Sequence, residues 1–260
     1  MSWLDSLILG ILQGISEFLP ISSSGHLVLG KYFLGIQSPG AVLEVILHLG
    51  TLVAILIYYR KEILDLVLGI IRNQKSEKNY TITIVIATIP AVIVGLLFEE
   101  QIDSLFSDPF AHILASIALI ATSVVLFSTK NIANKDSIKI TFSIAFFIGL
   151  AQVVAIIPGI SRSGMTIATG LFLGLASKDA TKFSFMMAIP VLFGAGILKL
   201  DDALNLISAE NIVPIFVGFV ASAVVGYIVI AWLVSLVSRN KLWMFSIYCL
   251  LIGLAGILFT

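Results

Sequence analysis

Two short polar segments carry the residues of this chain that could do chemistry, and both interrupt long apolar stretches. In the first, Gln13 and Glu17 stand four residues apart, so on a helix both side chains project from one face toward the same point. A run of serines and then His26 follow. In the second segment, Arg162 stands between two serines. A carboxylate, a guanidinium and clustered hydroxyls are groups that can bind and stabilise a phosphoryl group during its transfer.

The two segments are copies of each other. An offset of 139 positions aligns residues 10–35 with residues 149–174, and nine of the 26 pairs are identical. The identities are mostly Gly, Ser and Gln rather than the Leu and Ile that any two apolar segments share, which indicates an internal repeat. A duplicated apolar segment that Ser and Gly interrupt predicts a substrate site at the midplane of a two-repeat membrane protein.

Both segments predict an anion site. Each ends in serines that can cap the helix that follows, which leaves free backbone N–H groups at the positive end of the helix dipole. Two helix N-termini and an arginine fork suit phosphate. The residues expected to bind the substrate beside Arg162 are Gln13, Ser22, Ser24, Ser161, Ser163 and Thr166.

Several of these residues have a structural alternative. Ser and Gly also mediate close helix packing in membranes, so the serines could serve only as caps. Glu17 and Arg162 could merely pair with each other, although a charge at the bilayer centre costs roughly 2.5 to 3.5 kcal/mol. His26 could carry protons or act as a second cap. Glu44 and His48, again four residues apart, form either an interfacial pair or part of the site.

The composition predicts an all-α polytopic membrane protein. Hydrophobic residues make up 59% of the 260 positions and charged residues 12%, and the mean hydropathy is +1.11. The longest polar connection, residues 72–79, leaves no room for a soluble catalytic domain, and the formal net charge of zero with no basic stripe excludes a nucleic-acid partner. Cys249 is the only cysteine, so no disulfide forms within the chain. The long apolar windows are 3–20, 41–59, 80–98, 111–128, 138–157, 183–198, 212–236 and 242–259, with shorter ones at 27–36 and 165–176.

Loop charges predict the topology. Basic loops alternate with acidic ones, and basic loops belong on the cytoplasmic side. The windows at 27–36 and 165–176 are too short to span about 30 Å of hydrocarbon, which favours re-entrant hairpins. We therefore expect one membrane domain, 1–260, built from two inverted-topology repeats, 1–128 and 138–260, each a re-entrant helical hairpin plus three transmembrane helices, with both termini outside. The hairpins then open to opposite sides and their tips meet. The charges are Arg60, Lys61, Arg72, Lys75, Lys78, Lys130, Lys135, Lys139, Lys178, Lys182, Arg239 and Lys241 inside, and Glu99, Glu100, Asp103, Asp108, Asp201, Asp202 and Glu210 outside.

At these residues the chain resembles the bacterial undecaprenyl-diphosphate phosphatases, the bacitracin-resistance family, over essentially its whole length. The Glu-or-Gln, three residues, Glu pattern of that family fits Gln13 to Glu17. Its Ser-Ser-x-Gly-His stretch fits residues 22–26, and Pro-Gly-x-Ser-Arg-Ser-x-x-Thr fits residues 158–166. Where many members have Glu, this chain has Gln13, which cannot act as a base and is a weaker metal ligand.

The resemblance implies a membrane enzyme that hydrolyses undecaprenyl diphosphate to the monophosphate and inorganic phosphate. This reaction would recycle the lipid carrier for peptidoglycan synthesis and confer bacitracin resistance. It also implies the bacterial inner membrane, a site open to the periplasm and a divalent cation, for which Glu17 and Gln13 offer the oxygen ligands that Mg²⁺ or Ca²⁺ prefers. The catalytic residues would be Glu17, Arg162, His26 as proton carrier, and Ser23, which occupies the family's nucleophile position. A water activated by Glu17 or His26 is the alternative nucleophile.

A transporter or flippase for an anionic polyprenyl phosphate lipid is the rival interpretation, since inverted repeats with opposed hairpins are typical of alternating-access carriers. An anion carrier, however, needs no carboxylate, serine and histidine at the same tip. In either case the expected partners are the membrane and a long-chain polyprenyl phosphate or diphosphate lipid, and a homodimer stays open.

Overall fold

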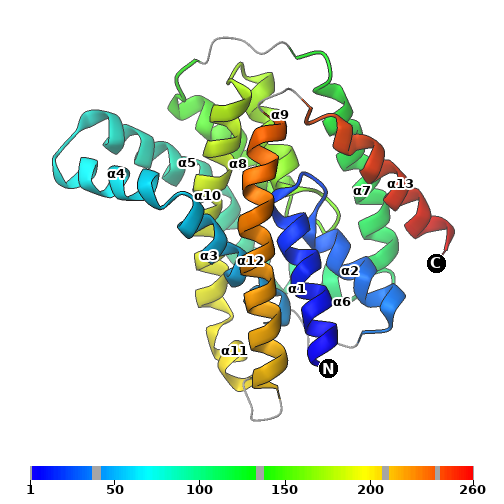
Figure 1. Cartoon of the computed structure of the whole chain (residues 1–260). Helices are drawn as coiled ribbons and strands as arrows, with labels where there is room; N and C mark the ends of the chain where they lie inside the picture. The colour runs from blue at the N-terminus through cyan, green and yellow to red at the C-terminus, as the bar shows by residue number, and fades with distance from the viewer. Residues whose placement is uncertain (1, 37–41, 133–137, 207–210, 238–240, 260) are drawn as a thin grey trace.

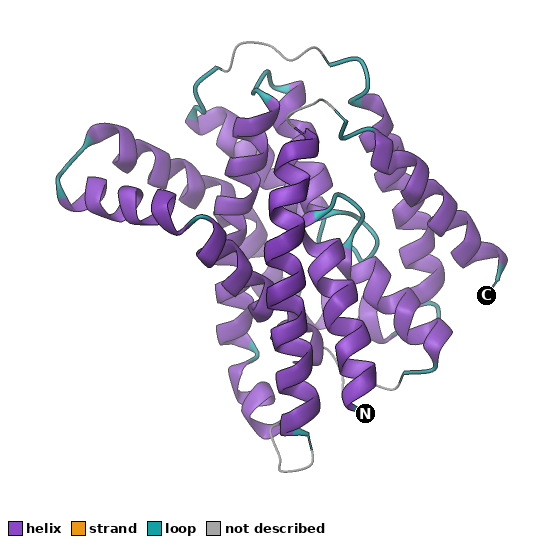
Figure 2. Ribbon diagram, in the orientation of Figure 1, coloured by secondary structure: helices purple, strands orange, loops and turns teal. Residues whose placement is uncertain are grey.

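Both polar segments lie between helices in the computed structural model, which describes residues 2–36, 42–132, 138–206, 211–237 and 241–259. Within these residues the chain forms thirteen helices and no strand (Figure 2). The predicted charges Lys135, Glu210 and Arg239 lie outside the described residues. The first half contains α1 (Trp3–Phe18), α2 (Ser23–Leu34), α3 (Val42–Tyr58), α4 (Arg60–Ile71), α5 (Lys75–Leu97), α6 (Glu99–Ser107) and α7 (Ala111–Ser128). The second contains α8 (Phe142–Val154), α9 (Arg162–Phe172), α10 (Ser177–Leu198), α11 (Leu200–Leu206), α12 (Ile212–Val237) and α13 (Met244–Leu258).

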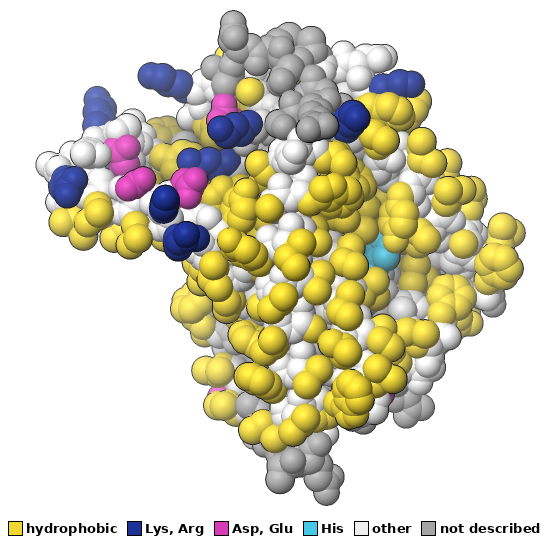
Figure 3. Space-filling model, viewed as in Figure 1, with side chains coloured by type: hydrophobic (Ala, Val, Ile, Leu, Met, Phe, Trp, Pro, Cys, Tyr) yellow, Lys and Arg dark blue, Asp and Glu magenta, His cyan; other side chains and the backbone are white. Residues whose placement is uncertain are grey.

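The prediction of an all-α, multi-pass membrane protein is confirmed. Helices α5, α7, α10 and α12 are each long and apolar enough to cross a bilayer, and the bent pair α3 and α4 makes a fifth candidate span. Apolar side chains cover the helical face seen in Figure 3, while Lys and Arg side chains gather toward one end of the molecule. This distribution suits a protein whose outer surface faces lipid and whose ends face water.

The two halves exchange packing partners. Helix α1 packs against α12 of the second half, and its counterpart α8 packs against α5 of the first half. Helices α3 and α10, which also correspond in order, contact each other near the centre of the bundle (Figure 1). Under a two-fold relation between the halves, a contact between α1 and α12 implies an equivalent contact between α8 and α5, as observed. The inverted orientation of the repeats, and their boundaries, stay predictions.

Three segments that the sequence suggested were loops are helical. A single residue separates α4 from α3, and the two helices are bent by 73° at this break. Together with the start of α5, α4 therefore forms an arm that projects from the bundle (Figure 1). Its apolar residues recur at helical spacing on an exposed face, a pattern typical of a helix lying along the membrane surface. The two acidic loops contain the short helices α6 and α11. The exposed apolar residues of α4 are Leu64, Val67, Leu68, Ile70 and Ile71.

Candidate active site

The two polar turns meet inside the protein. Gly25 at the start of α2 lies against Gly159 of the second turn, and a Cβ atom on Gly25 would come within 2.8 Å of the Gly159 Cα. The Ser163 hydroxyl donates a hydrogen bond of 3.1 Å to the Leu19 carbonyl and so joins the second turn to the first. Ile21 and Ile160 are buried beside these contacts. The expected meeting of the two tips is therefore observed.

Replacing Gly25 with alanine should push the turns apart, since the nearest atoms belong to backbone and cannot rotate away. We expect a loss of about 1 to 3 kcal/mol in the free energy of unfolding, the usual cost of overpacking. Thermal melting of the purified protein measures this loss. Gly95→Ala is the matched control, because its added Cβ meets no atom within 4 Å and alanine favours the helix; equal melting temperatures for both variants would contradict the close approach.

A serine caps each helix through the same side-chain hydrogen bond, although the backbone differs, with φ of 70° at Ser22 and −77° at Ser161. The Ser22 hydroxyl accepts a hydrogen bond from the Gly25 N–H at 3.2 Å, and Ser161 accepts one from the Gly164 N–H at 3.0 Å. The first residues of the two helices, Ser23 and Arg162, therefore occupy equivalent places. Both helix N-termini are positioned for an anion, with their first backbone N–H groups free of bonds within the helix.

Glu17 is the point where the two turns converge. Its Oε2 atom accepts hydrogen bonds from Ser23 Oγ at 2.6 Å and from Gln13 Nε2 at 3.1 Å. Its Oε1 atom forms an ion pair with Arg162, 145 residues away in sequence. The Glu17 side chain is 4% exposed and that of Arg162 16%, so the pair is shielded from solvent. A buried carboxylate with a serine hydroxyl and a guanidinium in contact can accept a proton from the serine beside a bound phosphate.

A cavity of about 570 Å³ opens above this cluster. Its polar lining includes Glu17, Arg162, Gln152 of α8 and serines of both turns, while its walls from α5 and α10 are largely apolar. An apolar cavity with a few converging polar groups is the usual form of a small-molecule binding site. The lining serines are Ser16, Ser22, Ser23, Ser24 and Ser161.

Residues of α6 and of the end of α10 also line the cavity. There the Lys199 ammonium contacts Glu99 at 2.7 Å and Asp103 at 2.9 Å, and the hydrogen bonds to these carboxylates raise the pKa of Lys199. A second ion pair joins Lys31 of α2 to Glu44 of α3. Glu99 and Asp103 of the first acidic loop are thus among the residues that line the cavity.

Of the two histidines weighed for the site, His48 rather than His26 lies beside Glu17. His26 Nδ1 lies 2.8 Å from the Ser22 carbonyl and Nε2 lies 2.9 Å from the Tyr248 hydroxyl of α13, so both ring nitrogens are engaged away from the Glu17 cluster. His48 Nε2 instead lies 3.3 Å from Glu17 Oε2. The structure thus brings His48 into the cluster and not His26, whose role as proton carrier stays a prediction. The four-residue spacing from Glu44 was the sequence signal for His48, whereas no sequence signal pointed to Tyr248.

Comparison with known proteins shows the family of this chain. The family model described as "Bacitracin resistance protein BacA" matches residues 6–255. The chain belongs to the BacA family. It is 38% identical to the undecaprenyl-diphosphatase of Christiangramia forsetii over 100% of this chain and 99% of that protein. It is 40% identical to the undecaprenyl-diphosphatase of Acinetobacter baumannii over 96% and 93% of the two chains, and 37% identical to undecaprenyl-diphosphatase 1 of Bacillus licheniformis over 98% and 97%.

Three predicted ligands of this BacA-family protein, Gln13, Ser163 and Thr166, do not line the cavity, and the last two have hydroxyls that bind protein atoms. Thr166 donates to the Arg162 carbonyl at 2.8 Å and shares a hydrogen bond of 2.7 Å with Ser184, and Ser163 bonds Leu19 as described. Their part in substrate binding stays a prediction, and what the structure gives them is a role in holding the second turn. Thr122 of α7, which the sequence did not single out, does the same through bonds to Gly159 and Ser161.

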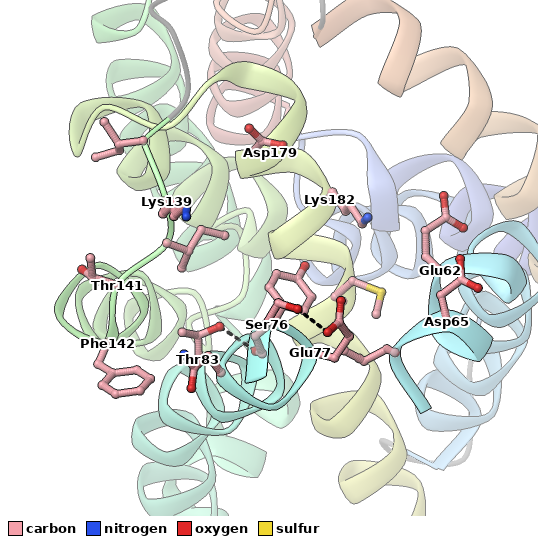
Figure 4. Close-up of a pocket in the computed structure, with 16 residues that line it drawn as sticks. Glu62, Asp65, Ser76, Glu77, Thr83, Lys139, Thr141, Phe142, Asp179 and Lys182 are labelled. Atoms are coloured by element: carbon pink, nitrogen blue, oxygen red, sulfur yellow. Dashed lines mark hydrogen bonds between the residues drawn. The ribbon is translucent and has the colours of Figure 1, made fainter. Parts of the chain in front are cut away.

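A second cavity, of about 860 Å³, lies between the projecting arm and the beginnings of α8 and α10, and it shares no lining residue with the first (Figure 4). Four carboxylates and two lysines line it, so its charge does not favour an anion. None of the predicted site residues is among them. The predicted chemistry therefore belongs to the first cavity. The charged residues of the second are Glu62, Asp65, Glu77, Asp179, Lys139 and Lys182.

Proposed function

We propose that this protein hydrolyses undecaprenyl diphosphate to undecaprenyl phosphate and inorganic phosphate. The observation that carries the proposal is the buried contact of Ser23 and Arg162 with Glu17, at the base of a cavity with apolar walls. Relatives named undecaprenyl-diphosphatase align over nearly the full chain and support the same activity.

In the proposed reaction, Ser23 Oγ attacks the terminal phosphorus of the diphosphate. The bond between that phosphorus and the bridging oxygen breaks, and undecaprenyl phosphate leaves. The serine proton passes to Glu17 Oε2, which lies 2.6 Å from the hydroxyl. Water then hydrolyses the phosphoserine and releases inorganic phosphate, which restores Ser23. In the alternative route a water attacks directly and Glu17 takes its proton.

Arg162 and the two helix N-termini would hold the diphosphate. The guanidinium pairs with Glu17 in the structure, and an entering phosphate offers it a second partner with stronger charge. Donors fixed in a site that excludes water stabilise the charge that moves to the leaving oxygen, and they need no reorganisation during the reaction. Ser22 and Ser24, which line the cavity beside Ser23, add hydroxyl donors.

The residues present fit a divalent cation only together with the substrate. Within the described part of the chain no group of three or more His, Cys, Asp or Glu residues could hold a metal ion. Glu17 nevertheless supplies one carboxylate, and Gln13 Oε1 is buried without a hydrogen-bond partner. Mg²⁺ is commonly bound by one or two carboxylates plus substrate phosphates, so Glu17 and Gln13 would hold it against the diphosphate. Bound there, the cation would neutralise phosphate charge.

The cavity also suits a lipid substrate at the outer face of the bacterial inner membrane. Its apolar walls would receive the first part of the prenyl chain, and its lining includes Glu99 and Asp103 of an acidic loop, which the charge rule assigns to the periplasmic side. Hydrolysis there would recycle the lipid carrier for peptidoglycan synthesis and confer bacitracin resistance.

Phosphate release by the purified protein tests the proposal. Incubation with undecaprenyl diphosphate and Mg²⁺ should release inorganic phosphate, and EDTA should reduce the rate by roughly a hundredfold or more, because loss of the cation leaves the phosphate charge uncompensated. Added Mg²⁺ or Ca²⁺ should restore the rate. Transfer of the lipid between leaflets of a proteoliposome without any phosphate release would contradict hydrolysis and support a carrier.

A further inference from the structure

The side chain of Gln152 lies in the active-site cavity with no partner. It is 3% exposed, and neither its Oε1 nor its Nε2 atom has a hydrogen bond within the described structure. It lines the same cavity as Glu17 and Arg162. A buried amide that leaves both its donor and its acceptor unpaired destabilises the folded protein. Such a group is therefore expected to meet a partner that enters the cavity.

Gln152 is the repeat counterpart of Gln13, but the two amides have different surroundings. Gln13 is followed four residues later by Glu17 and donates to it. Four residues after Gln152 stands Ile156, an apolar residue that also lines the cavity. The first amide therefore helps to hold the catalytic carboxylate. The Gln152 amide has no carboxylate to hold, so its donor and acceptor stay available to a ligand in the cavity.

The backbone that carries Gln152 is fixed. One turn earlier in α8, Gly149 lies so close to α5 that a Cβ atom there would come within 2.5 Å of the Ala87 carbonyl oxygen. A binding group on a tightly packed helix is held more accurately than one on a loop. The position of the amide is thus determined by the contact between α8 and α5.

We propose that Gln152 is a substrate-binding residue whose Nε2 donates a hydrogen bond to a phosphoryl oxygen of the diphosphate; this deepens the proposed function and rests on it. A diphosphate presents several anionic oxygens that all accept hydrogen bonds, and a neutral amide donates without adding charge. Its Oε1 can accept from water at the same time. The second repeat would then bind the headgroup through Arg162 and Gln152, while the first supplies Ser23 and Glu17.

Substitution by leucine separates this role from a structural one. Leucine has a similar size and carries no polar atom, so Gln152→Leu removes two unpaired buried groups. We expect the melting temperature without ligand to stay the same or rise. Because a hydrogen bond to an anion is lost, the Kd for inorganic diphosphate and the KM for undecaprenyl diphosphate should rise roughly tenfold to a hundredfold, with a smaller change in kcat.

Gln152→Glu identifies the partner of the amide. A carboxylate at this place repels a phosphate, so Gln152→Glu should weaken diphosphate binding more than Gln152→Leu does. If Gln152→Glu bound diphosphate as tightly as the wild type, or more tightly, in the presence of Mg²⁺, the side chain would face the cation and the proposed donation would be wrong. Gln74→Leu, at an exposed glutamine just before α5, controls for replacing a glutamine with leucine. It should leave the melting temperature, Kd, KM and kcat unchanged.

The decisive measurement is isothermal titration of the four purified proteins with inorganic diphosphate, since it needs no turnover. A lower melting temperature with an unchanged Kd for Gln152→Leu would show a structural residue and overturn the proposal, as would a wild type that binds no diphosphate. If the wild type bound diphosphate and Gln152→Leu weakened the binding, but the wild type released no phosphate from the lipid, the proposed hydrolysis would fail while Gln152 stood as an anion ligand.

Discussion

Replacement of Ser23 by alanine is expected to reduce kcat for phosphate release by a factor on the order of 10⁴ or more, the scale seen when a serine nucleophile is removed. The hydroxyl donates to Glu17 at 2.6 Å and lines the cavity, so both its base and its access to the substrate are in place. Alanine keeps the first position of α2 helical and removes only one hydroxyl. The loss should therefore appear in kcat rather than in stability.

Ser24→Ala is the matched control for Ser23→Ala. Ser24 is the next residue of the same helix and lines the same cavity, yet its hydroxyl lies 3.3 Å from Ser22 rather than against Glu17. Loss of the Ser24 hydroxyl should reduce kcat by less than about tenfold, the effect of losing one neutral hydrogen bond. Rapid acid quenching of the wild type with substrate labelled in its terminal phosphate should also trap label on Ser23. If Ser23→Ala released phosphate at a rate within tenfold of the wild type, and the wild type trapped no label, the nucleophile would be water rather than Ser23.

Most of the fold was predictable because hydrocarbon imposes a simple rule on the sequence. A span must be long and apolar, and the windows predicted at 80–98, 111–128 and 212–236 correspond to α5, α7 and α12. The arm formed by α4 was not predicted, because its charged residues resemble a cytoplasmic loop and its apolar face shows only at helical spacing. Amphipathic helices at a membrane surface lack the continuous apolar run that identifies a span.

The internal repeat made one part of the site predictable, namely that its two polar turns meet. Internal similarity indicated that two distant turns meet, and the structure brings Arg162 to Glu17. Contacts that depend on packing between helices of different repeats had no such signal: Tyr248 reaches His26 across 222 positions. Ser163 and Thr166 were expected to face the ligand, but a hydroxyl near a turn can equally bond the backbone, and in these two it does. Residue type alone does not separate these uses.

Replacing both Glu17 and Arg162 should restore the stability that each single replacement lowers, but it should not restore catalysis. Glu17→Gln or Arg162→Met alone leaves a buried charge without its opposite, and each should lower the free energy of unfolding by about 3 kcal/mol. The two together remove both charges and keep similar volumes, so the double variant should recover most of that stability. Thermal melting of the four proteins measures this cycle.

Catalysis should not recover in the double variant. Glu17→Gln removes the group that accepts the Ser23 proton, and Arg162→Met removes a cation that stabilises the transferring phosphoryl group, an effect worth roughly 10³ to 10⁵ in kcat for comparable arginines. We therefore expect phosphate release to fall by at least about 10³ in each single variant and in the double variant. A double variant that regained both stability and activity would contradict the site, because a pair that only holds the two turns together needs no charge for turnover. A double variant that is stable and inactive would show that both charges are retained for the reaction.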